Sequence, residues 1–97
     1  MTKKSNGSRK PSRDTLLEFP CRFPIKAMGR ASEGFQDIVT HIVRGHAELW
    51  PGESVRCNES RNGNYLAVTL VVRATSQDQL DAIYQDLTDS PDVLMAL

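Results

Sequence analysis

The sequence predicts an α+β domain, a ferredoxin-like βαββαβ sandwich in which two helices cover one face of a four-stranded antiparallel sheet. Residues 63–74 alternate at period two, and one face of this run is wholly apolar. The opposite face is mixed, which is typical of a sheet covered by helices on one side only. Two stretches with helical spacing of apolar residues complete the order strand, helix, strand, strand, helix, strand. The apolar face comprises Leu66, Val68, Leu70, Val72 and Ala74.

The first strand is expected over residues 21–28 and ends at Gly29. Because proline cannot donate a ladder hydrogen bond, its paired part should begin after Pro24 or bulge there. Ser32 is the predicted N-cap of the first helix, and Gly45 suits the end of that helix. The apolar stripe of the helix is Phe35, Ile38, Val39, Ile42 and Val43.

The second strand is expected over residues 53–60 and joins the long strand through a hairpin. Asn62-Gly63 is the preferred pair for a type I′ turn, because both central positions need positive φ. Ser76 and Gln79 have the spacing of a capping box at the start of the second helix. The last strand is expected over residues 93–97. The buried stripe of the second helix is Leu80, Ile83, Tyr84 and Leu87.

The 97 residues divide into a disordered basic arm over residues 1–14 and one folded domain over residues 15–97. The formal net charge is zero, yet residues 1–13 carry five basic residues and no acid. The rest therefore forms an acidic body with seven basic and twelve acidic residues. No apolar run approaches the ~20 residues of a membrane span, and the N-terminus lacks a secretory signal. Two cysteines make no disulfide framework, so we expect a cytoplasmic protein.

A set of short motifs is spread from Leu16 to the last residue. They are Leu16-Leu17-Glu18-Phe19-Pro20, Lys26-Ala27-Met28-Gly29, Gly63-Asn64-Tyr65, Ala74-Thr75 with Gln79, and Ile83-Tyr84 with Leu87. In this order and at these spacings they resemble the small bacterial YbeD-like family, a domain of unknown function that sometimes carries a lipoate-regulation label. The resemblance implies a fold similar to the ACT regulatory domains, which bind small effectors. It carries no catalytic residue over to this chain.

The loop that enters the first helix is the predicted ligand site. It consists of Gly29, Arg30, Ala31 and Ser32. Amides at a helix N-terminus attract anions, Arg30 adds positive charge, and glycine lets a ligand approach the backbone. The resemblance adds that the corresponding loop of ACT-like domains often contributes to effector binding. We therefore expect a small anionic metabolite here; the alternative is a capped turn with a solvated arginine.

The mixed outer face of the sheet is the predicted interface, for a homodimer or for a protein partner. Its residues are Lys26, Met28, Tyr65, Ala67, Thr69, Val71 and Arg73. Enough of this face is apolar that association would relieve its exposure. The alternative is a modestly apolar face left in water, which monomers tolerate.

Other kinds of site find less support. RNA-recognition domains share the topology but stack bases on aromatic residues, and the outer face offers only Tyr65. His41 and His46 are five residues apart, Cys57 is expected to be a small buried side chain, and no metal, cofactor or catalytic grouping is predicted. The predicted function is a non-catalytic, ACT-like regulatory or ligand-binding module. The alternative is a protein-interaction adaptor that uses the sheet face, with RNA binding and an enzyme ranked below both.

Overall fold

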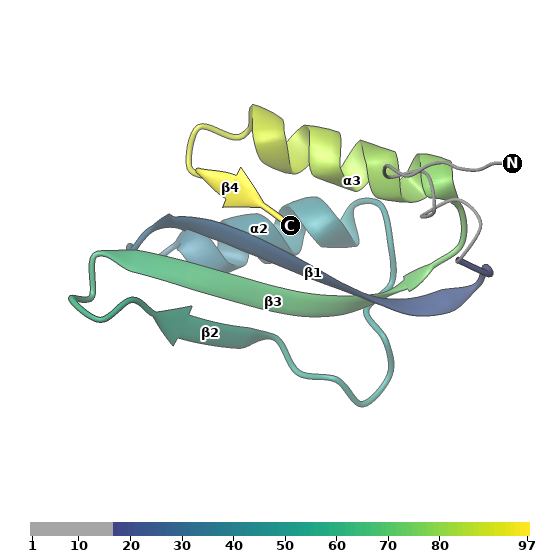
Figure 1. Cartoon of the computed structure of the whole chain (residues 1–97), viewed down its shortest axis with the longest axis horizontal. Helices are drawn as coiled ribbons and strands as arrows, with labels where there is room; N and C mark the ends of the chain where they lie inside the picture. Colours follow the sequence, from purple (N-terminus) through teal and green to yellow (C-terminus); the bar gives the residue numbers. More distant parts are fainter. Residues whose placement is uncertain (1–16) are drawn as a thin grey trace, which may run out of the picture.

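The computed structural model describes residues 17–97, so the arm predicted over residues 1–14 lies outside the described residues. The elements follow one another in the predicted order, as Figure 1 shows. They are β1 (Cys21–Arg30), α2 (Phe35–Arg44), β2 (Arg56–Glu59), β3 (Tyr65–Ala74), α3 (Gln77–Asp89) and β4 (Met95–Ala96).

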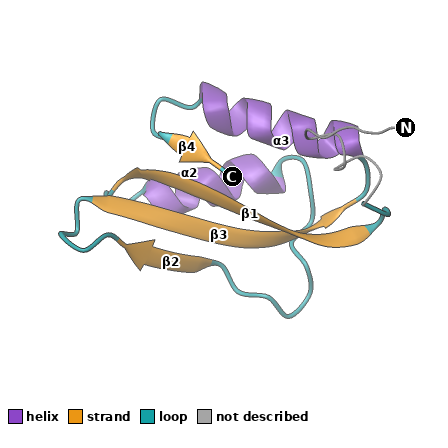
Figure 2. Ribbon diagram, viewed as in Figure 1, coloured by secondary structure: helices purple, strands orange, loops and turns teal. Residues whose placement is uncertain are grey.

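The four strands form one antiparallel sheet in the order β2-β3-β1-β4. The central strands β1 and β3 pair along their whole length, from Cys21 opposite Ala74 to Arg30 opposite Tyr65. Both helices lie on the same side of this sheet, and no helix of residues 17–97 covers the other side (Figure 2). The predicted ferredoxin-like sandwich is therefore confirmed.

The core lies between the sheet and the two helices, where the period-two pattern of β3 predicts it. The fully buried residues of β3 are Val68, Leu70, Val72 and Ala74. Leu66, near the start of the strand, packs against this core. Each of these residues faces a residue of β1 in register, for example Ile25 opposite Leu70. The helices contribute the predicted stripes, namely Phe35, Val39 and Val43 from α2 and Leu80, Ile83 and Leu87 from α3.

Pro24 lies inside the paired part of β1, opposite Val71, so the expectation that pairing begins beyond it is wrong. The backbone N–H and C=O of Lys26 both bond to Leu97, which places them on the β4 side of the strand. Alternate residues of an antiparallel strand direct these groups to the same side. The nitrogen of Pro24 therefore faces the edge of β1 beyond the end of β4, where no ladder bond with β3 is lost.

Gly29 does not end the first strand as predicted, because β1 continues to Arg30. It pairs with Leu66 and is buried. A Cβ at this position would clash with the carbonyl oxygen of Asp92 and would lie 2.5 Å from Cε1 of Phe35. Glycine is thus required here for close packing of β1 against the start of α2 and the segment before β4.

The first helix begins later than predicted. Its N-cap is Gly34, and no side chain caps it; the Phe35 amide bonds instead to the backbone oxygen of Ser32, at 3.3 Å. Ser32 lies in the turn before the helix, so its predicted role as N-cap is wrong. Sequence spacing identified the apolar stripe of α2 but not the extra turn that precedes it.

The hairpin between β2 and β3 forms as predicted, although β2 is shorter and the turn differs from type I′. The Gly63 amide donates to the carbonyl of Ser60 at 2.9 Å, so these two residues end the turn. Gly63, at the last position of the turn, has a positive φ of 76°. A longer loop of this kind uses glycine at its left-handed position instead of an Asn-Gly pair at its centre.

Ser76 caps α3 as predicted, since its Oγ accepts a hydrogen bond from the Gln79 amide at 3.0 Å. Replacing Ser76 with alanine is therefore expected to lower the free energy of unfolding by about 1 kcal/mol, because the amide loses its acceptor. Ser32→Ala is the matched control and should change stability by less than about 0.5 kcal/mol, since the Ser32 side chain caps nothing. Urea unfolding of both variants measures the difference, and equal losses would contradict these cap assignments.

Candidate functional site

The predicted ligand loop lines a hollow of about 360 Å³ at one end of the sheet. The chain reaches it from β1, turns before α2, and meets the segment that leads from α3 to β4. The backbone anchors this loop, because the Ala31 amide donates to the Asn64 carbonyl at 2.9 Å. The hollow is lined by Arg30, Ala31, Ser32, Phe35, Pro91, Asp92 and Leu94.

Three of the four predicted loop residues line this hollow, and the fourth, Gly29, packs behind two of its lining residues. Arg30, Ala31 and Ser32 are exposed, whereas Gly29 is buried against Phe35 and Asp92. Gly29 thus allows close packing of the protein itself. Pro91 and Leu94 supply exposed apolar surface to the hollow, whereas Phe35, which also lines it, is a core residue with 1% of its surface accessible.

Two groups of opposite charge line the hollow. Arg30 supplies the cation and Asp92 the carboxylate, and neither has an ion-pair partner within residues 17–97. An arginine can bind a carboxylate or phosphate through two parallel hydrogen bonds. Because Asp92 opposes a second negative charge, a singly charged or zwitterionic ligand fits these residues better than a multiply charged one.

The seven predicted interface residues lie on the face of the sheet opposite the helices. The register pairs Lys26 with Thr69 and Met28 with Ala67 on this outer face. Val71 is an exception to its expected exposure, because only 4% of its surface is accessible. Near it, the Glu53 carboxylate reaches the guanidinium of Arg22, whose Nε donates at 2.9 Å.

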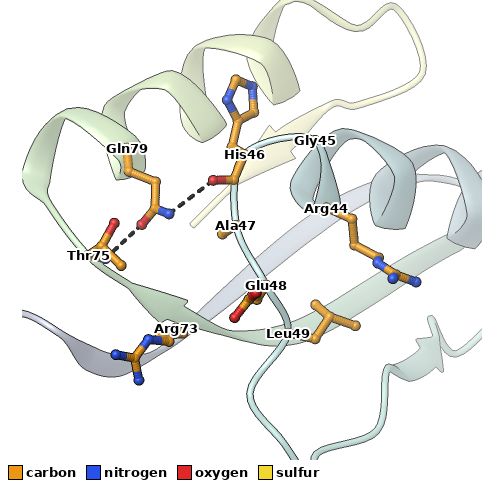
Figure 3. Close-up of a pocket in the computed structure, with 9 residues that line it drawn as sticks. All are labelled: Arg44, Gly45, His46, Ala47, Glu48, Leu49, Arg73, Thr75 and Gln79. Carbon is orange, nitrogen blue, oxygen red and sulfur yellow. Dashed lines mark hydrogen bonds between the residues drawn. The ribbon is translucent and has the colours of Figure 1, made fainter.

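A second and larger hollow, of about 820 Å³, was not predicted from the sequence. It lies where α2 ends, β3 ends and α3 begins (Figure 3). Sequence patterns single out Gly45 as a helix end, Arg73 as an interface residue and Gln79 as a capping residue, but none of them predicts a shared site; these residues meet through the path of the loop after α2. The lining residues are Arg44, Gly45, His46, Ala47, Glu48, Leu49, Arg73, Thr75 and Gln79.

Several polar groups that line this larger hollow already bond to other groups of the protein. The Gln79 side chain accepts from the Thr75 amide at 2.8 Å and donates to the His46 carbonyl at 2.9 Å (Figure 3). The His46 ring contacts the Asp86 carboxylate of α3 at 2.6 Å. Arg44 and Arg73 point in different directions (Figure 3), so they do not converge on one anion. The arrangement indicates a structural junction between α2, β3 and α3.

Two further kinds of site, a reactive thiol and a metal centre, concern the cysteine, histidine and carboxylate side chains of residues 17–97. Cys57 is exposed, not buried as expected, and its thiol donates to Oε1 of Gln36 at 2.9 Å. Partial desolvation raises the pKa of the Cys57 thiol, which keeps it protonated at neutral pH and makes it a poor nucleophile. Within the same residues no cluster of three histidine, cysteine, aspartate or glutamate side chains is placed to hold a metal ion. Nor does any helix among them have the length and apolar character needed to cross a membrane.

Solved structures of similar shape confirm the fold. The ACT domain of the GTP pyrophosphokinase of Chlorobium tepidum superposes with a TM-score of 0.62 at 13% identity, covering 78% of this chain and 94% of that domain. A protein of H. pylori superposes with a TM-score of 0.69 at 12% identity, over 94% of this chain and 98% of its own. At such low identity these likenesses concern the fold alone.

Sequence relatives identify the family. A UPF0250 protein of Nitrosomonas europaea is 44% identical over 84 residues, which cover 87% of this chain and 97% of that protein. A UPF0250 protein of Ralstonia nicotianae is 37% identical over the full length of both chains. The family model described as "Protein of unknown function (DUF493)" matches residues 14–97. The resemblance inferred from short motifs is thereby confirmed, and the chain belongs to the DUF493 family.

Proposed function

We propose that this protein is a non-catalytic, ACT-like regulatory module that binds a small anionic metabolite in the hollow beside Arg30. The observation that carries the proposal is the meeting of the loop 29–32 with Phe35 and Asp92 around a space of about 360 Å³. Binding pockets combine an apolar wall with a few polar groups that fix orientation, and this hollow offers both. The ACT-like fold supports the regulatory part of the proposal.

The charges of the hollow define the class of ligand. Arg30 would bind a carboxylate or phosphate group, and the exposed Leu94 side chain would contact the apolar part of the same molecule. Asp92 would oppose a second anionic group and accept a hydrogen bond from a donor. A monocarboxylate with an apolar body, or an amino acid, therefore fits the proposal better than a di- or triphosphate.

The proposal that the module is non-catalytic rests on the side chains that line the hollow beside Arg30. Arg30 and Asp92 are the titratable groups that line the hollow, and no nucleophile paired with a base stands beside them. We further propose that the module acts in the cytoplasm, in keeping with its free cysteines Cys21 and Cys57.

Thermal unfolding with and without metabolites tests this function. The panel includes lipoate, octanoate, amino acids and nucleotides, each added singly. A true ligand at about a hundred times its dissociation constant should raise the free energy of unfolding by roughly 2.7 kcal/mol. In a domain of this size that gain moves the midpoint by roughly 10 °C or more.

The variant Arg30→Glu should abolish the shift, because the ligand would meet a carboxylate in place of the guanidinium. Arg61→Glu makes the same charge change in the exposed β2–β3 loop and should leave the shift intact. A panel without any selective shift, or a shift that Arg30→Glu leaves unchanged, would remove the hollow as the ligand site.

A further inference from the structure

Positive charge gathers on the face of the sheet that no helix covers. The register places five basic side chains at outer-face positions of the strands and no acidic one. These outer-face cations are Arg22, Lys26, Arg30, Arg56 and Arg73. The only acid in β2, Glu59, pairs with Leu66 and therefore points to the helix side. The outer-face positions of the strands are thus basic, with Glu53 paired to Arg22 at one end, although the described body as a whole is acidic.

The helix layer carries the opposite charge. Together α2 and α3 hold five aspartates against one arginine, Arg44, and α3 contains no lysine or arginine. Four of these aspartates, Asp78, Asp81, Asp86 and Asp89, belong to α3. The two layers therefore present opposite charges to solvent.

The centre of the outer face holds two cations without a carboxylate partner. Lys26 and Arg56 both pair with Thr69, from the strands on either side of β3. Strands lie about 4.8 Å apart, so the two backbones are about 10 Å apart across the sheet. Neither side chain has an ion-pair partner within residues 17–97, whereas Arg22 bonds to Glu53. Lys26 and Arg56 are thus free to bind carboxylates on the same incoming segment.

An apolar depression lies beside Lys26. It has a volume of about 270 Å³ and is lined by Pro24, Ile25, Lys26, Thr69 and Leu97. Leu97 is 62% exposed and Met95 in β4 is 49% exposed, so large apolar side chains border it. A partner that covers this region gains from burying them.

Three classes of partner make different demands on this face. A second copy docked sheet against sheet by a two-fold axis would bring the same five cations together, which is unfavourable. Single-stranded nucleic acid would need several aromatic side chains on the central strands, where Tyr65 is the one outer-face aromatic and Met28, Ala67 and Thr69 occupy the middle. An acidic protein segment with an apolar side chain satisfies both the cations and the depression.

We propose that the open sheet face docks an acidic protein segment, which places an apolar side chain in the depression beside Leu97 and carboxylates at Lys26 and Arg56. The docking contacts at Lys26, Arg56 and Leu97 do not line the hollow beside Arg30, although Arg30 itself borders both, so either proposal stands if the other fails. The interaction is expected to weaken with salt, since its charges are solvent-exposed.

Nuclear magnetic resonance titration of the full chain tests the docking surface. The probes are a short acidic peptide with a central leucine, the same peptide with serine in place of leucine, and single-stranded oligothymidine. We expect the leucine peptide to bind most tightly and to shift the amide signals of Lys26, Thr69 and Leu97. The double variant Lys26→Glu/Arg56→Glu should weaken that binding by roughly tenfold or more, because like charges then meet.

The matched control is Arg44→Glu/Arg61→Glu, which makes the same change in net charge away from the outer face. It should alter affinity by no more than about twofold, because exposed charges at a distance are screened. Residues 1–14 are present in every variant, so their basic side chains cannot account for a difference between the pairs. The milder pair Lys26→Gln/Arg56→Gln replaces the first if the spectrum of the charge-reversed protein shows unfolding.

Four results would overturn the proposal. Tighter binding of oligothymidine would make the face a nucleic-acid surface, and equal binding of the serine peptide would remove the apolar anchor. Equal losses in both double variants would mean that binding follows net charge instead of this face. Concentration-dependent shifts of Lys26 and Thr69 without any peptide would indicate that a second copy occupies it.

Discussion

Gly29→Ala is expected to lower the free energy of unfolding by about 3 kcal/mol or more, because the new methyl group has no room. Its Cβ would overlap the Asp92 carbonyl oxygen and would lie 2.5 Å and 2.8 Å from two ring atoms of Phe35. A flexible side chain could move away, but a backbone carbonyl and a fully packed ring cannot do so without shifting β1 against α2. The midpoint of thermal unfolding should fall by roughly 12 °C or more.

Gly34→Ala is the control for this substitution. Nothing lies within 4 Å of a Cβ at Gly34, whose φ of −93° suits alanine. The variant should stay within about 1 kcal/mol of the original protein, because removal of a glycine also reduces the entropy of the unfolded chain. Equal stability of the two variants in urea would contradict the close packing around Gly29. A loss confined to Gly29→Ala would show that packing alone accounts for this glycine.

Leu70→Ala is expected to cost about 2–5 kcal/mol, since it removes a fully buried side chain from the centre of the core. Leu70 faces Ile25 across the sheet and lies beneath both helices, so little of the structure can collapse into the space. A domain of this size has only about 5–15 kcal/mol of stability in total. The variant should therefore melt at least roughly 8 °C below the original protein.

Leu94→Ala makes the same chemical change at a leucine that is 62% exposed. Leu94→Ala should lower the free energy of unfolding by less than about 1 kcal/mol, because folding buries little of the Leu94 side chain. Calorimetry of both variants compares them directly. If Leu94→Ala were as destabilising as Leu70→Ala, the assignment of the inner face of β3 to the core would be wrong.

Much of the fold could be predicted because it depends on periodicity. The alternation in β3 and the helical stripes of α2 and α3 place apolar side chains on one face, and burial requires those faces to meet. The hairpin followed from glycine at position 63. The local errors have a different cause: the end of β1, the start of α2 and the turn type depend on backbone contacts between segments distant in sequence. Gly29 is an example, because the need for glycine arises from Asp92, 63 positions later.

The candidate site was predictable in part for the same reason. The loop 29–32 was found from glycine and arginine beside an expected helix start, and it does line a hollow. Asp92 and Phe35 also line this hollow, but no sequence pattern predicts their place there, because the path of the folded chain brings them to the loop. The basic character of the outer face could have been read from the alternation of Arg22, Lys26 and Arg30 along β1. Net charge concealed it, because the balancing aspartates belong to another layer.

The orientation of Pro24 also limits how this sheet can grow. A strand added beside β1, beyond the part that β4 covers, would find no amide donor at Pro24 to match its own carbonyl. The added chain would bury an unsatisfied acceptor there, so edge-to-edge association of sheets into fibrils is opposed at this edge. Copies of the protein held at high concentration are thereby protected from templated aggregation along the uncovered edge of β1. Any lasting association is directed to the outer face or to the short edge strands β2 and β4.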